Sequence, residues 1–147
     1  MTRIARYLFF VLTSLLLIGI LVQVYLVGLS MLGGKSGVMG FHNGFGLLLG
    51  PVTLLIILPA YLGHLPSQCK LFSWLSFAIY IAMLVLANVR QSAPFAAALH
   101  PALAVILFAI TISQVIRAWK AMRELLGTAA QRASKFEVAG MGESTVR

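Results

Sequence analysis

The strongest constraint on this chain is the set of long segments that carry no charge. No Asp, Glu, Lys or Arg occurs between Arg6 and Lys35, between Lys35 and Lys70, between Lys70 and Arg90, or between Arg90 and Arg117. Each gap can hold the ~20 apolar residues that cross a bilayer core about 30 Å thick. Only 10% of the 147 residues are charged and 61% are hydrophobic, whereas soluble domains carry about a quarter charged residues. A water-soluble enzyme, a disordered protein and a nucleic-acid-binding protein are thereby excluded.

We therefore predict an all-α fold, a four-helix transmembrane bundle formed by residues 1–127 as one domain. The helices are expected at about 7–31, 41–63, 71–90 and 95–119, with the last continuing into water to about 126, just before Gly127. Residues 128–147 mix small, polar and charged residues without periodicity. They are expected to form a disordered cytoplasmic tail attracted to anionic lipids, or else to dock on a partner subunit.

The distribution of Lys and Arg predicts the orientation, because cytoplasmic loops carry an excess of these residues. With the N-terminus inside, nine of the 11 lie on the inner side and two on the outer side. Both termini are then cytoplasmic, as expected for a multi-pass protein of a bacterial inner membrane. The inner set is Arg3, Arg6, Lys70, Arg117, Lys120, Arg123, Arg132, Lys135 and Arg147, and the outer set is Lys35 and Arg90.

Acidic residues and cysteines are too few for several kinds of chemistry. The chain has no Asp, and Glu124, Glu137 and Glu143 all lie outside the predicted spans. Carboxylate-pair catalysis, carboxylate proton relays and most metal–oxygen sites are therefore not expected. The single cysteine, Cys69, allows neither a disulfide framework nor a zinc motif.

Polar residues within the spans gather towards the outer side, whereas the inner half holds mainly hydroxyl side chains. Polar groups in hydrocarbon usually face the bundle interior or a cavity, so a cluster at one depth is a candidate site. Its members are Gln23, Tyr25, Ser30, His42, Asn43, Asn88, Arg90, Gln91 and His100.

Two histidines are the most informative members of this cluster. His42 and His100 lie on different predicted helices at nearly the same depth, counted at ~1.5 Å per residue. Two neutral imidazoles facing each other across a bundle suit a six-coordinate haem iron. We therefore expect one haem b, with His42 and His100 as the axial ligands.

The residues around this pair are compatible with such a group. Gly46 and Gly50 follow the first histidine by one and two turns on the same helix face, where they would let a flat macrocycle approach the backbone. Arg90 could pair with the propionates, and Gln23 or Asn88 could hydrogen-bond an imidazole or a propionate.

The same residues also have plainer interpretations. Gly46 and Gly50 can form a helix-packing notch, and His42 can be a solvated helix end. Pro101 can simply kink its helix and free the carbonyl of Ala97. Structural packing of polar residues is therefore an alternative, as is a chlorin pigment, which would leave one histidine unused.

Only one bis-histidine site is possible, which limits the function. His64 stands 22 residues after His42, roughly 33 Å along a helix, and has no partner at its level. The expected role is therefore electron transfer near the outer, periplasmic face with a quinone or another redox protein, alone, as a homo-oligomer or within a larger membrane complex. The alternative is an accessory or structural subunit without a cofactor. A solute or haem transporter ranks last, because the inner half offers no continuous polar path.

Two segments carry a resemblance to known families: Phe41-His42-Asn43-Gly44-Phe45-Gly46 and Ala98-Leu99-His100-Pro101-Ala102. Over about residues 5–120 the chain resembles a small bacterial four-helix membrane family of unknown function. More distantly, a histidine near the outer start of the second and fourth helices resembles one half of haem A synthase and the b-type membrane cytochromes. That resemblance implies a haem site. The single bis-histidine site and the lack of a nearby acidic residue argue against haem A synthesis.

Overall fold

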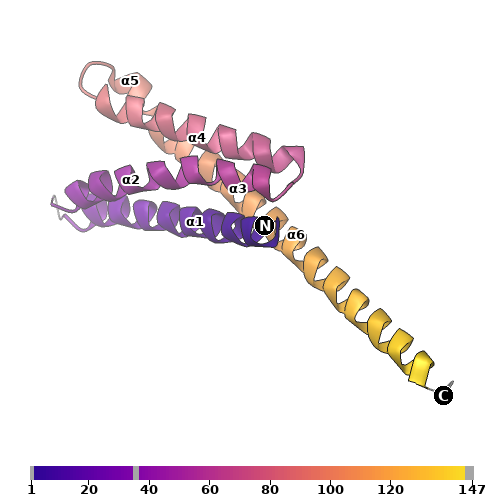
Figure 1. Cartoon of the computed structure of the whole chain (residues 1–147). Helices are drawn as coiled ribbons and strands as arrows, with labels where there is room; N and C mark the ends of the chain where they lie inside the picture. The colour runs from indigo at the N-terminus through magenta and orange to yellow at the C-terminus, as the bar shows by residue number, and fades with distance from the viewer. Residues whose placement is uncertain (1, 35–36, 145–147) are drawn as a thin grey trace.

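The structure, a computed structural model, describes residues 2–34 and 37–144, and the side chains of residues 125–126 and 128–144 lie outside this description. All regular elements in the described part are helices (Figure 1). They are α1 (Thr2–Leu32), α2 (Val38–Leu55), α3 (Ile57–Leu62), α4 (Ser67–Asn88), α5 (Pro94–Ala97) and α6 (Leu99–Ser144).

Four helical segments of the described chain are long and apolar enough to cross a membrane: Thr2–Leu32, Val38–Leu62, Ser67–Asn88 and Pro94–Glu124. Each span contains an apolar stretch of 18 residues, and no more than 33% of any such stretch is buried inside the bundle. The remaining apolar surface suits the hydrocarbon of a bilayer. The predicted all-α fold with four spans is confirmed, and the chain is a multi-pass membrane protein.

Prolines interrupt two of the spans; the sequence had suggested a kink at Pro101 but no break before Pro59. The second span breaks at Ile56, between α2 and α3, and the fourth breaks at Ala98, between α5 and α6. Pro59 and Pro101 each lack the N–H that would bond to the carbonyl four residues earlier, and their rings crowd that carbonyl. Each break therefore falls three residues before a proline.

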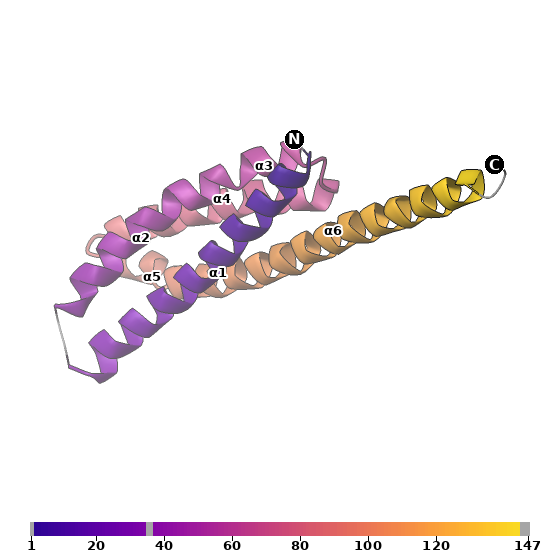
Figure 2. The same cartoon turned by 60° about the horizontal axis from the view of Figure 1, so that its bottom comes forward.

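The sequence had suggested that the last helix ends near Gly127, but the helix does not end there. It continues through this glycine to Ser144, so a helix occupies most of the segment expected to be a disordered tail. One glycine costs only about 1 kcal/mol in a helix. The next residues include several alanines and no proline, so the backbone continues as a helix. Figures 1 and 2 both show this part of α6 extending away from the bundle.

The helices form a bundle in which α1 and α4 lie on opposite sides, and each contacts both α2 and α6. Among the described residues, the backbones of α2 and α6 do not approach each other, so these two helices form a diagonal pair. Close packing of α1 on α2 depends on Gly19, where a Cβ would lie 2.5 Å from Leu49 Cδ2. Residues on α2 and α6 can therefore meet only across the centre of the bundle.

A buried polar cluster joins α4 to α6. Gln114 of α6 is fully buried, and its Nε2 donates to Ser73 Oγ of α4 at 3.3 Å. Ser76 Oγ, one turn further along α4, donates to Gln114 Oε1 at 3.3 Å. Unpaired polar groups are costly in hydrocarbon, so these bonds set how α6 is placed along α4.

We predict that Ser76→Ala destabilises the fold by about 0.5–2 kcal/mol, the range measured for hydrogen bonds between membrane helices. The substitution removes the donor to Gln114 Oε1 and leaves that oxygen buried. Ser113→Ala is the matched control, because Ser113 Oγ donates to Ala109 O of its own helix. Reversible unfolding in detergent–SDS mixtures measures both variants. Equal effects of the two substitutions would contradict the role of Ser76.

Candidate functional site

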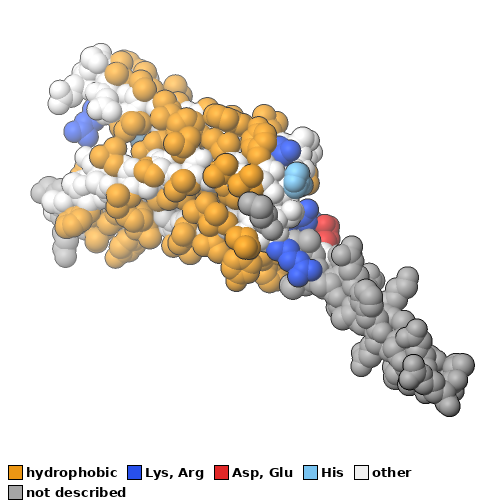
Figure 3. Space-filling model, viewed as in Figure 1, with side chains coloured by type: hydrophobic (Ala, Val, Ile, Leu, Met, Phe, Trp, Pro, Cys, Tyr) orange, Lys and Arg blue, Asp and Glu red, His pale blue; other side chains and the backbone are white. Residues whose placement is uncertain are grey.

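The two ends of the bundle differ in their polar residues. Lys and Arg side chains gather where α6 leaves the bundle, and hydrophobic side chains cover most of the visible body (Figure 3). We call this the basic end, formed by Arg3, Arg6, Lys70, Arg117, Lys120 and Arg123. At the opposite end, His42 lies in the second turn of α2 and His100 is the second residue of α6; we call this the histidine end. His64 is exposed in the turn after α3, away from the other two histidines.

His42 and His100 face each other across the bundle. Their ring centres lie 6.5 Å apart with an interplanar angle of 64°. The backbones of α2 and α6 do not otherwise approach, so the two rings extend into the space between diagonal helices. Both side chains are half-buried. The structure thus brings together the two residues predicted to form a site.

Hydrogen bonds anchor this pair to the other two spans. The Nδ1 atom of His100 lies 3.0 Å from Met83 O of α4, and Gln23 Nε2 of α1 donates to His42 O at 3.0 Å. Two buried atoms lack partners among the described residues, His42 Nδ1 and Gln23 Oε1. Buried polar groups are nearly always hydrogen-bonded, so these two atoms could each accept or donate one further hydrogen bond.

Protein side chains occupy the space beside Gly46 and Gly50. A Cβ on Gly46 would lie 2.5 Å from Gln23 Nε2, and a Cβ on Gly50 would lie 2.7 Å from the Tyr80 ring. Tyr80 Oη also donates to Gly46 O at 3.3 Å, across from α4. The glycines therefore admit Gln23 and Tyr80 in this structure.

Sequence reasoning missed Tyr80 as a neighbour of the site. It lies four residues after Ser76 and three before Met83, a spacing that places all of them on one face of α4. The hydroxyl of Ser76 pointed to that face as the interior one, so helical spacing was the signal that could have found Tyr80.

The structure does not bring Asn88 and Arg90 into contact with the histidines. Asn88 is exposed, and its Nδ2 donates to Leu84 O of its own helix. Arg90 is exposed in the turn after α4 and makes no hydrogen bond or ion pair with other described residues. Tyr25 and Asn43 are exposed as well. The contacts at the histidine end thus come from Gln23, His42, Tyr80, Met83 and His100.

The donor set of the site is small and nitrogen-based. The described residues contain no group of three or more His, Cys, Asp or Glu side chains that could hold a metal ion. Two imidazoles alone suit a metal whose other ligands come from a bound group, as in haem proteins.

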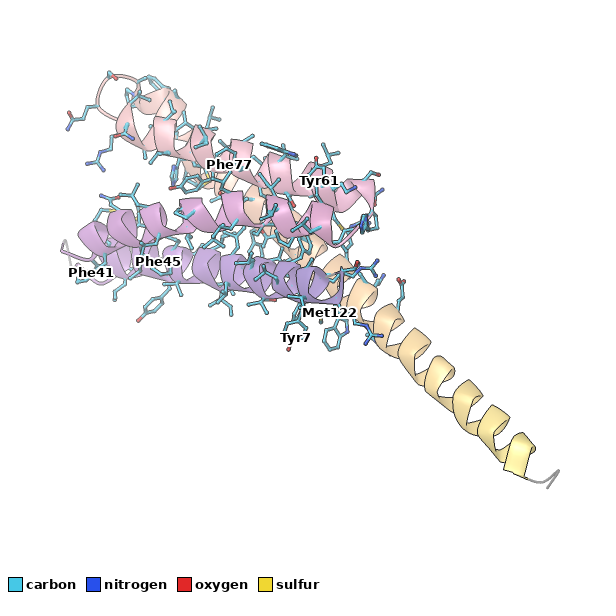
Figure 4. All side chains as sticks on the ribbon, viewed as in Figure 1. Tyr7, Phe41, Phe45, Tyr61, Phe77 and Met122 are labelled. Atoms are coloured by element: carbon cyan, nitrogen blue, oxygen red, sulfur yellow. The ribbon has the colours of Figure 1, made fainter. Side chains whose placement is uncertain are left out.

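A separate apolar groove of about 410 Å³ lies between α1 and α2, where Val22 and Leu26 meet Phe41 and Phe45. Phe41 and Phe45 lie near the start of α2 (Figure 4), close in sequence to His42. Neither His42 nor His100 lines the groove.

Comparisons with known proteins add no relative to this description. No family model matches the chain, and searches of curated proteins and of solved structures find no significant match.

The close packing of Tyr80 on Gly50 can be tested with a matched pair of glycine-to-alanine variants. Gly50→Ala places a methyl group within 2.7 Å of the Tyr80 ring, and overpacking of this kind costs about 1–3 kcal/mol. Gly44→Ala adds the same methyl group where nothing lies within 4 Å. We expect SDS-driven unfolding to show a loss of stability for Gly50→Ala alone. An unchanged midpoint for Gly50→Ala would show that Tyr80 does not pack there.

Proposed function

We propose that this chain is an integral membrane protein that binds one haem b at its histidine end, with His42 and His100 as axial ligands. The observation that carries the proposal is the approach of the two imidazoles, 6.5 Å between ring centres, from two helices whose backbones do not approach each other. The buried, unpartnered His42 Nδ1 and Gln23 Oε1 support it. Both atoms belong to side chains of the histidine end.

The spacing of the rings is compatible with a single metal ion between them. An imidazole nitrogen lies about 1 Å from its ring centre and about 2 Å from a metal that it ligates, so two opposed imidazoles have centres roughly 6 Å apart. The contact of His100 Nδ1 with Met83 O favours a proton on Nδ1. Its Nε2 then keeps the lone pair that a metal requires.

The surroundings fit a macrocycle after local rearrangement. Gln23 and Tyr80 lie over Gly46 and Gly50, and both are long side chains that could turn aside to admit a flat ring. Gln23 Oε1, which lacks a partner, could then accept a hydrogen bond. Asn88 ends the span Ser67–Asn88 and Arg90 lies in the exposed turn that follows, where its guanidinium could pair with a propionate.

Haem iron, when bound, supplies a one-electron redox couple, so the proposed role is electron transfer. The charge distribution favours both termini in the cytoplasm of a bacterial inner membrane, and in that orientation the histidine end would face the periplasm. A quinone in the bilayer or a periplasmic redox protein is the expected partner. His64 is exposed in the turn after α3, so one haem per chain is proposed.

A second candidate function is an accessory subunit without a cofactor of its own. The observation in its favour is that Gln23 and Tyr80 already fill the space beside Gly46 and Gly50. The histidines would then fix how the helices pack. This alternative requires a colourless protein whose fold depends on His100.

Absorption spectra of detergent-purified protein, oxidised and then reduced with dithionite, test the proposal. We expect a Soret shift and a sharp reduced α-band in the wild type, both lost in His42→Asn and in His100→Asn. Asparagine at position 100 can still donate to Met83 O, so the loss would report ligation rather than packing.

His64→Asn is the control for these spectra. Residue 64 has φ = 48°, a conformation that asparagine tolerates, and it lies away from the other two histidines. Its spectrum should equal that of the wild type. Colourless wild-type protein that stays colourless after reconstitution with haemin would contradict haem binding and favour the accessory subunit.

A further inference from the structure

Three side chains form a contact cluster on the outside of the bundle at its basic end, which we call the Tyr61 cluster: Tyr61, Lys70 and Trp74. Trp74 Nε1 donates to Tyr61 Oη at 3.2 Å, and Lys70 Nζ lies 5.0 Å from the centre of the Tyr61 ring. Tyr61 and Trp74 remain 47% and 49% exposed. Figure 4 shows Tyr61 at the end of the bundle where α3 and α4 meet. The proposed haem site uses none of these residues.

The Tyr61 cluster has hydrogen-bond donors to spare. The Tyr61 hydroxyl accepts the indole N–H, so its own hydrogen remains free to be donated. The Lys70 ammonium carries three N–H groups, and contact with the ring face leaves some of them free. Lys70 thus places one positive charge over the ring of Tyr61, whose hydroxyl is held by Trp74, and this pairing of a cation with a hydroxyl donor suits an anion.

The depth of the cluster matches that of lipid headgroups. Tyr61 is one residue from the end of the span Val38–Leu62, and Lys70 lies in the first turn of the span Ser67–Asn88. Trp and Tyr concentrate at this level of a membrane. Leu58, Leu62, Leu71 and Leu75 are exposed on the same helices, so acyl chains can lie against α3 and α4.

The charge of this end selects the kind of lipid. Arg3, Lys120 and Arg123 are exposed at the basic end and Lys70 is half-buried, and a basic juxtamembrane surface attracts anionic lipids. A zwitterionic headgroup would bring its own cation towards these charges. The partner that fits is therefore an anionic glycerophospholipid.

We infer that Tyr61 and Lys70, with Trp74 holding the tyrosine hydroxyl in place, bind the phosphate of an anionic phospholipid. Lys70 supplies the charge and Tyr61 donates a hydrogen bond to a phosphate oxygen. Because the site lies at the opposite end from the histidines, it does not depend on haem binding.

Native mass spectrometry of detergent-purified protein tests this site, with phosphatidylglycerol and phosphatidylcholine of identical acyl chains added in turn. The wild type should retain phosphatidylglycerol preferentially. Lys70→Gln should lower its retention about fivefold, the equivalent of ~1 kcal/mol for one lysine near a membrane surface. Tyr61→Phe, which keeps the ring and removes the donor, should lower retention by a smaller factor.

Lys120→Gln is the matched control, because it removes the same charge at the same end and its residue lies outside the Tyr61 cluster. Retention by this variant should fall less than retention by Lys70→Gln, because Lys120 contributes only to the general attraction of the basic end. An equal loss for Lys120→Gln and Lys70→Gln would show that only the overall charge attracts the lipid, and would overturn the site. Equal retention of the two lipids by the wild type would overturn it as well.

Discussion

A polar group in hydrocarbon must find its partner within the protein, and this constraint governs the arrangement of the bundle. The buried hydroxyls of Thr13, Thr53 and Thr111 each donate to a carbonyl of their own helix, at 2.7 to 2.8 Å. Gln114 is too long for that solution and pairs instead with Ser73 and Ser76 of the facing helix. These hydrogen bonds define how α4 and α6 pack against each other.

The same constraint is not met at the histidine end, where His42 Nδ1 and Gln23 Oε1 are buried without partners among the described residues. Elsewhere in the interior, the long polar side chain of Gln114 uses both of its amide atoms. The proposed ligand would supply the partners that these two atoms lack. The diagonal placement of α2 and α6 leaves the two imidazoles as the only described ring pair facing each other there.

Much of the fold follows from the sequence because charge is so unevenly distributed. The uncharged gaps located all four spans, and helical rise alone placed His42 and His100 at a common depth. A kink at Pro101 could be suggested from the sequence, whereas the break before Pro59 and the passage of α6 through Gly127 depend on local competition between small energies, which periodicity does not reveal. The neighbours of Gly46 and Gly50 depend on which helices become adjacent. Gln23 and Tyr80 could therefore be assigned to these glycines only from the three-dimensional structure.

The most direct test of the central claim is electron paramagnetic resonance of the oxidised wild-type protein, with haem iron determined on the same sample. Two imidazole ligands predict a low-spin ferric signal and about one iron per chain. A high-spin signal would mean that at least one of the two histidines does not ligate the iron. That result, or the absence of bound iron after growth with a haem supply, would contradict a haem held between His42 and His100.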